Sequence, residues 1–473
     1  MTYQVPHHIN KDKIFIVKKS EIKGRLDPHY NQPLYIELWD KLLSISAKIT
    51  TLRESSISIF SGITPKRGGD AYTDNQGIPF VRSGDFSETN EIDFSQLLCI
   101  KENIHNALMA NSKLQNGDLL IAIVGATIGK VGVYQYNYEA NINQAICAVR
   151  LKKNLNPYYV QAFLQTDVGK NIIERTKRPV ARANINLEEV GSFPIPLLDS
   201  HRQDMIVDIM EFGRKQKRAK EFEAQQLLDS IDGYLLKELG ITIPEIETDI
   251  GYRMFVVQRS DLKGRYTPSL YKDAISLCST IYDNIPLSHL AYINPNTRLS
   301  YQDKEMLISF VPMESINEIY AEITDNKNCF IAESKGFTRF QEGDLLWAKI
   351  TPCMENGKSA IAKDLINGYG CGSTELHVIR PKNDNLLVGY IHSLLHMKIV
   401  RQTAKLYFGG SAGQQRVATD FLENFNVPLP SKTKQQEIVD YIADIRTRAK
   451  ALQVEGKVIL ENAKRKVEQI IIG

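Results

Sequence analysis

The chain contains an internal repeat of about 230 residues, and this feature limits its possible folds more than any other. Four short blocks recur in the same order with offsets between 226 and 240 residues. The blocks pair residues 14–28 with 254–268, Phe80-Val81 with Phe310-Val311, Gly117–Leu120 with Gly343–Leu346, and 193–208 with 425–440. Chance similarity would not keep four blocks collinear. The sequence therefore predicts one structural unit that is used twice.

Each repeat first alternates short apolar runs with glycine-rich turns. Leu119–Val124 and Leu345–Ile350 both follow a Gly-Asp turn, which is typical of a short buried strand. Helical patterns follow at Tyr158–Glu174 and Leu386–Lys405, and a proline-rich strand comes after each. We therefore predict an α+β fold class with two mixed α/β globules, each of roughly 190 residues.

Each repeat ends in a long helical segment. After Pro430 and the candidate cap Ser431, apolar residues recur with the 3.5-residue period of a coiled coil, and Asp199–Leu239 has a weaker version of the pattern. We expect the two helices to pack antiparallel as a coiled-coil spacer that relates the globules by a pseudo-two-fold. The second seam comprises Ile438, Ile442, Ile445, Ala449, Leu452, Ile459, Ala463 and Ile470, with interruptions at Gly456 and Lys466. The predicted domains are 1–198 and 240–430 for the globules, and 199–239 and 431–473 for the helices.

Composition excludes some protein classes without naming a function. The net charge of +3 neither indicates nor excludes a nucleic-acid partner, because a basic groove can be offset by acidic residues elsewhere. The six cysteines include no Cys-x-x-Cys pair, so neither a disulfide framework nor structural zinc is expected. The longest apolar stretch, Leu119–Gly129, is too short for a membrane span, and the N-terminus has no signal-peptide core. A cytoplasmic protein is expected.

No sequence motif for catalysis is complete. Gly125–Lys130 resembles a phosphate-binding loop but has three residues between its glycines where four are needed, and Gly357–Ser359 has only the end of that motif. His392 and His396 have helical spacing without the glutamate of a zinc protease. Asn156–Tyr159 lacks the second proline of the loop with which amino-methyltransferases hold a base. We interpret these segments as turns, packed histidines and a helix N-terminus capped by Asn156. We therefore predict a chain that is not an enzyme, with no catalytic residue and no bound cofactor or metal.

Two related globules on helices suit a two-part target along double-stranded DNA. Residues 168–182 form a basic run, and residues 401–416 hold Gln and Arg side chains that can contact base edges. Because the repeats differ most in these loops, they are expected to read different sequences. The DNA-contact candidates are Lys66, Arg67, Arg82, Lys177, Arg178 and Arg182 in the first repeat, and Lys349, Gln414, Gln415 and Arg416 in the second.

The motifs together resemble the specificity (S) subunit of type I restriction-modification systems. The first repeat contributes Gly62–Pro65, Gly77–Asp85, Asn116–Leu120 with Gly129-Lys130, and Pro194–Val207; the second contributes Gly343–Leu346, Gly413–Gln415 and Pro428–Val439. The resemblance implies two target-recognition domains that each read one half of an asymmetric DNA site, with the helices as a spacing ruler. It also implies two docked modification subunits, which bring the S-adenosylmethionine chemistry, and restriction subunits that can join them. The second repeat departs at Phe310–Met313, where Arg82 and Ser83 have no counterpart.

Two other interpretations explain part of the sequence. A coiled-coil scaffold with protein-binding globules accounts for the helices and the small net charge, but not for the divergent polar loops. A self-contained methyltransferase is opposed by the missing cofactor loop.

Overall fold

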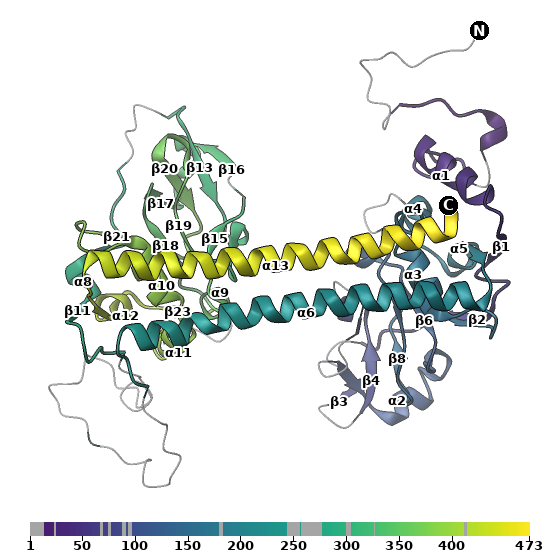
Figure 1. Cartoon of the computed structure of the whole chain (residues 1–473), viewed down its shortest axis with the longest axis horizontal. Coiled ribbons are helices and arrows are strands. Elements are labelled where there is room, and N and C mark those ends of the chain that lie inside the picture. Colours follow the sequence, from purple (N-terminus) through teal and green to yellow (C-terminus); the bar gives the residue numbers. More distant parts are fainter. Residues whose placement is uncertain are drawn as a thin grey trace. The chain divides into compact units, whose positions relative to one another are not determined.

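The fold is described from a computed structural model, in which the chain divides into two compact units (Figure 1). The first unit comprises Met1–Glu221 with Gln453–Gly473, and the second comprises Phe222–Leu452. Each unit is described by itself. The structure describes residues 14–22, 25–66, 70–73, 77–87, 91–92, 97–178, 183–243, 256, 277–298, 304–325, 327–410 and 414–473.

The first unit contains two four-stranded sheets, ordered β2-β9-β6-β7 and β3-β5-β4-β8, and the pair β1-β10. Its strands are β1 Lys48–Thr51, β2 Ser56–Ser61, β3 Tyr72–Thr73, β4 Ile78–Val81, β5 Leu98–Ile100, β6 Leu119–Ala122, β7 Val131–Val133, β8 Asn141–Ile142, β9 Ile146–Leu151 and β10 Pro194–Leu197. Its helices are α1 Pro33–Leu43, α2 Glu102–Asn106, α3 Pro157–Leu164, α4 Asp167–Thr176 and α5 Leu187–Gly191, followed by the start of α6 Ser200–Glu238.

The second unit repeats this plan, with sheets ordered β12-β21-β18-β19 and β16-β13-β20-β17 and the pair β11-β24. Two small hairpins, β14-β15 and β22-β23, complete its described strands. The strands are β11 Asn284–Pro286, β12 Ala291–Ile293, β13 Leu307–Val311, β14 Ile316–Asn317, β15 Glu322–Ile323, β16 Lys327–Phe330, β17 Thr338–Gln341, β18 Leu345–Ala348, β19 Ser359–Ile361, β20 Tyr369–Gly372, β21 Leu376–Pro381, β22 Phe408–Gly409, β23 Arg416–Val417 and β24 Asn426–Pro428. The helices are α8 Leu287–Leu290, α9 Cys353–Asn356, α10 Val388–His396, α11 Lys398–Lys405, α12 Thr419–Glu423 and the start of α13 Lys432–Ile472.

Equivalent side chains make the same contacts in both units, which confirms the predicted duplication. In the first, buried Asp118 accepts two hydrogen bonds from Arg150 at 2.9 and 2.8 Å. In the second, buried Asp344 accepts two from Arg380, both at 2.7 Å. Gly117 and Gly343 precede these aspartates with φ values of +91° and +84°. Since only glycine adopts such a conformation without strain, the repeated Gly-Asp marks one turn used twice.

A buried glutamine joins each globule to its long helix. The Gln203 side chain accepts from the backbone N–H of Asn156 at 2.8 Å and donates to the carbonyl of Leu198 at 2.8 Å. Gln435 accepts from the backbone N–H of Leu387 at 2.9 Å and donates to the carbonyl of Pro430 at 3.0 Å. These buried amides satisfy backbone groups at the start of α6 and α13. They also establish that α6 and α13 correspond with an offset of 232 residues.

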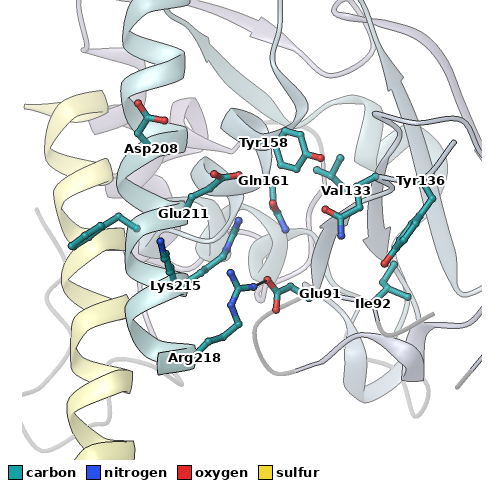
Figure 2. Close-up of a pocket in the computed structure, with 13 residues that line it drawn as sticks. Glu91, Ile92, Val133, Tyr136, Tyr158, Gln161, Asp208, Glu211, Lys215 and Arg218 are labelled. Carbon is teal, nitrogen blue, oxygen red and sulfur yellow. Dashed lines mark hydrogen bonds and ion pairs between the residues drawn. The ribbon is translucent and has the colours of Figure 1, made fainter. Parts of the chain in front are cut away.

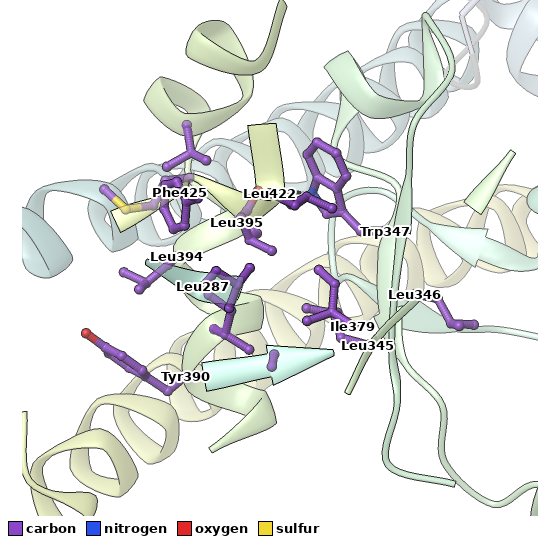
Figure 3. Close-up of a cluster of buried hydrophobic side chains, with 14 of the residues drawn as sticks. Leu287, Leu345, Leu346, Trp347, Ile379, Tyr390, Leu394, Leu395, Leu422 and Phe425 are labelled. Atoms are coloured by element: carbon purple, nitrogen blue, oxygen red, sulfur yellow. Dashed lines mark hydrogen bonds between the residues drawn. The ribbon is translucent and has the colours of Figure 1, made fainter. Parts of the chain in front are cut away.

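The core of the second unit lies between the sheet that contains β18 and the helix α10 (Figure 3). Leu345, Leu346 and Trp347 are at most 1% exposed, as expected for a strand buried on both faces. Tyr390 of α10 packs against this core and donates its hydroxyl to the carbonyl of Pro428 at 2.7 Å. In the first unit β6 is likewise buried throughout, so the predicted strands after both Gly-Asp turns are confirmed.

The helical segments predicted at Tyr158–Glu174 and Leu386–Lys405 are each two shorter helices. Thr166 ends the α3 segment and caps α4 by accepting from the backbone N–H of Gly169 at 3.1 Å. In the second unit Met397 has φ −53° and ψ 137°, which interrupts helical geometry between α10 and α11. The Asn156 cap with Pro157 at the first position of α3 is confirmed.

The long helices α6 and α13 pack antiparallel within each unit. In the first unit Lys220 forms an ion pair with Glu455 at 3.1 Å, and in the second Glu238 pairs with Lys434 at 2.7 Å. In the first unit a Cβ on Gly213 would lie 2.8 Å from Ala463, and in the second the ring centroids of Tyr234 and Tyr441 lie 4.0 Å apart. Within each unit the residue number therefore falls along one helix as it rises along the other, and the predicted antiparallel packing is present.

The predicted interruption of the seam at Gly456 is wrong. Gly456 is buried, and a Cβ there would lie 3.4 Å from the Cα of Lys217, so the absent side chain lets the two helices approach closely. Beyond it the most buried positions are Leu460, Val467 and Ile471. Leu460 and Ile471 each lie one residue after a predicted seam position, Ile459 and Ile470 respectively.

The predicted division into four domains stays a prediction, since the compact units divide both long helices between them. Of the repeat block 254–268, only Val256 lies among the described residues. Within the described residues, no helix combines the length and the apolar character that spanning a membrane requires. The six cysteines are all free thiols.

Candidate nucleic-acid interface

Three of the four candidates in the second unit lie together at the end of β18. The backbone carbonyl of Lys349 accepts from the N–H of Val417 at 2.8 Å, and that of Gln415 accepts from the N–H of Thr351 at 3.0 Å. These bonds bring the loop that ends at Arg416 beside β18. Gln414 is exposed and adjoins the cluster, with its carbonyl accepting from Arg416 at 2.8 Å.

The first unit places the corresponding loop in the same position. The N–H of Gly125 donates to the carbonyl of Ala183 at 3.0 Å, and the N–H of Ile185 donates to the carbonyl of Ile123 at 3.0 Å. These bonds match those of Thr351 and Val417 in the second unit. The candidates Lys177 and Arg178 stand just before this loop, where the N–H of Arg178 donates to Asn184 at 3.3 Å. The described ends of the two candidate loops are therefore structurally equivalent.

Lys66 and Arg82 belong to segments that meet at Asn143. Asn143 links the two segments, because its carbonyl accepts from the N–H of Gly62 at 3.3 Å and its N–H donates to Val81 at 3.1 Å. A Cβ on Gly62 would lie 1.6 Å from a backbone oxygen, so only glycine permits this approach. Lys66 is exposed, and no ion pair joins it to another described residue.

Acidic residues neutralise several of the candidate cations. Arg416 donates twice to Glu375, both at 2.8 Å, and this pairing lowers the pKa of Glu375 and raises that of Arg416. Arg178 pairs with Glu189 at 2.9 Å. Lys177 pairs with Glu174, and Arg82 pairs with Asp85. Glu375 and Glu189 were not predicted as partners from the sequence. No sequence signal links Glu375 to Arg416, which lies 41 residues away.

One residue of the predicted basic run belongs to the interior. Arg175 is 6% exposed, and its guanidinium stacks on Tyr30 and Trp39 with centroid distances of 4.2 and 5.1 Å. It cannot reach a phosphate on the surface, so the interpretation of residues 168–182 as a continuous basic surface is wrong at this position. The candidates Arg67 and Arg182 lie outside the described residues.

The segments that resemble catalytic motifs have structural roles in the described residues. Gly125 and Gly129 adopt left-handed turns before β7, and Gly357 ends α9 in the same conformation. His392 Nε2 lies 3.0 Å from the Ser359 hydroxyl, and burial lowers the pKa of the ring well below its usual value. Burial also lowers the pKa of His396 to about 3. His392 is also buried, and His396 Nε2 lies 3.0 Å from the carbonyl of Glu318, as expected for packed histidines.

Comparison with known proteins identifies the family. The family model described as "Type I restriction modification DNA specificity domain" matches twice, at residues 57–227 and 296–455. The EcoEI specificity subunit of Escherichia coli is 38% identical over 190 residues, which cover 40% of this chain and 31% of the relative. The EcoAI specificity subunit of the same species is 35% identical over 192 residues, which cover 39% and 31%. The matches thus span about a third of the length of these relatives.

One solved structure supports the fold independently of sequence. A chain from a structure on assembly and conformational transition of the type I R-M system has a TM-score of 0.51 with 14% identity, covering 90% of this chain and 97% of that one. At this identity the similarity bears on the fold alone. The two family-model matches fall on the two copies of the repeated fold and together cover more than half of the sequence. The chain belongs to the family of type I restriction-modification DNA specificity proteins.

Proposed function

We propose that this chain is the DNA-reading subunit of a type I restriction-modification complex and catalyses no reaction itself. Each repeat contacts one half of an asymmetric, two-part DNA site. Two modification subunits dock on the chain and supply the S-adenosylmethionine chemistry, and restriction subunits can join them. The complex works in the cytoplasm. The methyl transfer takes place on the modification subunits, so this chain needs no cofactor.

One observation carries the proposal: the same fold occurs twice, with different side chains at one equivalent loop. The first loop follows Lys177 and Arg178 and returns at Asn184, whereas the second carries Gln414, Gln415 and Arg416. Different donors and acceptors on equivalent loops suit two different base sequences. Lysine side chains such as Lys66 are suited to phosphate contacts, which position a protein on DNA without reading its sequence.

The loops can be tested by base-resolution methylation mapping in a host that carries the complete system. Gln414→Ala removes an exposed side chain, and we expect it to relax the second half-site at one base pair while the first half-site is unchanged. Gln225→Ala, an exposed position on α6, is the matched control and leaves the motif unchanged. Lys66→Ala weakens binding to all sites and reduces the dependence of log K on log salt by about one unit. A methylated motif that stays intact in a chain with both loops exchanged refutes the proposal.

The helices would act as the ruler between half-sites. Lys220 lies opposite Glu455, so insertions after Glu221 and after Leu452 fall at the same level of the antiparallel pair. Inserting one heptad at both points preserves the seam, and we expect it to lengthen the gap between half-sites by about 10 Å, or about three base pairs. Inserting the heptad in α6 alone is the control and should abolish modification. An unchanged gap with the double insertion excludes a ruler.

A further inference from the structure

A pocket of about 420 Å³ lies between α6 and the globule in the first unit (Figure 2). Glu211, Lys215 and Arg218 line it from α6, and Tyr158 and Gln161 line it from α3. Figure 2 shows Glu211 and Arg218 extending from α6 toward the globule, where Arg218 pairs with Glu91 at the edge. The pocket is separate from the loops proposed to read DNA.

A buried arginine of α6 forms one wall of this pocket. Arg214 is 8% exposed, and its Nη2 donates to the side-chain oxygen of Gln165 at 3.1 Å. Its Nε is enclosed, and no hydrogen-bond acceptor reaches it in the described part of the chain. Gln161 and Gln165 both donate to the carbonyl of Val131, at 3.0 and 3.1 Å, and this fixes their side chains. Burial lowers the pKa of Arg214, and the charges of Glu91 and Glu211 oppose this shift only in part.

The second unit contains the equivalent pocket, with a volume of about 520 Å³. Arg446 follows Gln435 by eleven residues, as Arg214 follows Gln203. Its Nε is also enclosed without an acceptor among the described residues, and burial lowers its pKa to about 10. His392 takes the position of Gln161 and faces this pocket as a neutral ring.

The edges of the two pockets also correspond. Lys450 pairs with Glu322 at 2.6 Å in the second unit, and Arg218 pairs with Glu91 in the first. Glu91 and Glu322 thus pair with the outer cation, and neither inner arginine has a carboxylate within 4.0 Å among the described residues. Glu91 and Glu211 still favour the charge of Arg214, and Glu322 that of Arg446, without a direct ion pair. A buried charge without an anionic partner is strongly unfavourable, and an apolar residue would be more stable there. Its presence at the same position in both repeats indicates a ligand.

We propose that each pocket binds one acidic side chain of a partner protein, which forms an ion pair with Arg214 in the first unit and with Arg446 in the second. Because the two pockets are equivalent, they take the same segment from two copies of one partner. This inference rests on the proposed function, in which two modification subunits dock on the chain. A carboxylate suits the guanidinium because two parallel hydrogen bonds then use Nε and a terminal nitrogen.

The charges around the first pocket favour a single carboxylate over DNA. Asp208, Glu211 and Glu91 all line it, and their combined repulsion of several phosphates across the opening exceeds their repulsion of a single carboxylate. One acidic side chain on a protein surface can enter without bringing further negative charges. The DNA backbone is therefore the competing occupant that the experiment must distinguish.

The test measures how many modification subunits bind the full-length chain, by native mass spectrometry and analytical ultracentrifugation. The variants are Arg214→Met, Arg446→Met and the double replacement. Arg202→Met and Arg448→Met, exposed arginines on the same two helices, are the matched controls. We expect each single pocket variant to bind one subunit with wild-type affinity and the second at least about thirty-fold more weakly. The double variant loses both, and the controls bind two.

A second measurement separates ligand binding from a structural role. Because methionine removes an unpartnered buried charge, the thermal unfolding midpoint of the isolated chain should stay the same or rise in both pocket variants. A lowered midpoint would overturn the inference. A double variant that still binds two modification subunits would also overturn the inference, and so would one that loses only salt-dependent DNA affinity. Both results would leave the proposed function intact. Failure of the wild-type chain to bind any modification subunit would refute the proposed function itself.

Discussion

Replacement of Asp344 by asparagine tests the buried ion pair that anchors β18 of the second unit. Asp344 is 1% exposed and accepts three hydrogen bonds, two from Arg380 at 2.7 Å and one from the backbone N–H of Gln341 at 2.8 Å. Asparagine has the same shape, but its amide group directs hydrogen atoms at the guanidinium or at the backbone N–H. At least one of the three bonds is lost, and the charge of Arg380 is no longer neutralised.

The size of the expected loss of unfolding free energy follows from the burial of Asp344 and Arg380. Breaking a fully buried ion pair costs about 3–5 kcal/mol. The side chain of Arg380 is 21% exposed, so water partly compensates its charge, and we expect a loss of about 3 kcal/mol in the free energy of unfolding. Single domains are typically stable by about 5–15 kcal/mol, so this is a large fraction of the stability of the unit.

Tryptophan fluorescence can follow the second unit alone. The chain has two tryptophans, Trp39 in the first unit and Trp347 in the core of the second, so Trp39→Phe leaves one reporter. With a urea dependence of about 1–3 kcal/mol per molar, the expected loss moves the midpoint down by about 1–3 M. Asp384→Asn, at an exposed position, is the control and should not move it. A loss below about 0.5 kcal/mol for Asp344→Asn would refute the assignment of this pair as an anchor.

Two further predictions concern the helix pair and the buried histidines. A Cβ on Gly213 would lie 2.8 Å from the Cβ of Ala463, so Gly213→Leu should destabilise the chain by about 1–3 kcal/mol in urea unfolding. Gly233 has open space around it, so Gly233→Leu should stabilise the chain by about 0.5–1 kcal/mol. Equal effects of the two replacements would contradict the close approach of the helices. The folded-state pKa of His392 and of His396 lies below the ordinary value, so both rings take up protons when the chain unfolds in acid. Their contribution to stability is complete above about pH 6.5 and falls below that pH by up to about 1.4 kcal/mol per pH unit for each ring. A His396→Gln variant whose free energy of unfolding has an unchanged slope against pH would disprove this.

The repeat and its secondary structure were largely predictable because they depend on local chemistry. Gly117-Asp118 and Gly343-Asp344 predict turns since glycine adopts positive φ, and the apolar residues after them predict buried strands. The break between α3 and α4 was not predicted, although Thr166 is a good capping residue. Its neighbours have continuous helical character, and the break depends on how the side chain of Thr166 bonds the backbone of Gly169.

The candidate site was predictable only in part. The equivalence of the two loops follows from the order of the repeats, but the partners of the cations do not. Arg175 reads as a surface charge in the sequence and is enclosed by two aromatic rings in the structure. A guanidinium can be solvated by water, a carboxylate or an aromatic face, and only the packing of distant segments determines which.

Alignment of the repeats could have located Arg214 and Arg446, because both follow an equivalent glutamine by eleven residues. Sequence alone determined that one unit is used twice, that each copy mixes strands with helices, and that a long helix follows each globule; periodicity and turn chemistry are properties of neighbouring residues. Tertiary structure decided which charges are neutralised, where Gly456 brings two helices together, and that the Nε of both arginines is enclosed without a hydrogen-bond acceptor among the described residues. Burial and pairing depend on residues far apart in the chain, and no local pattern encodes them.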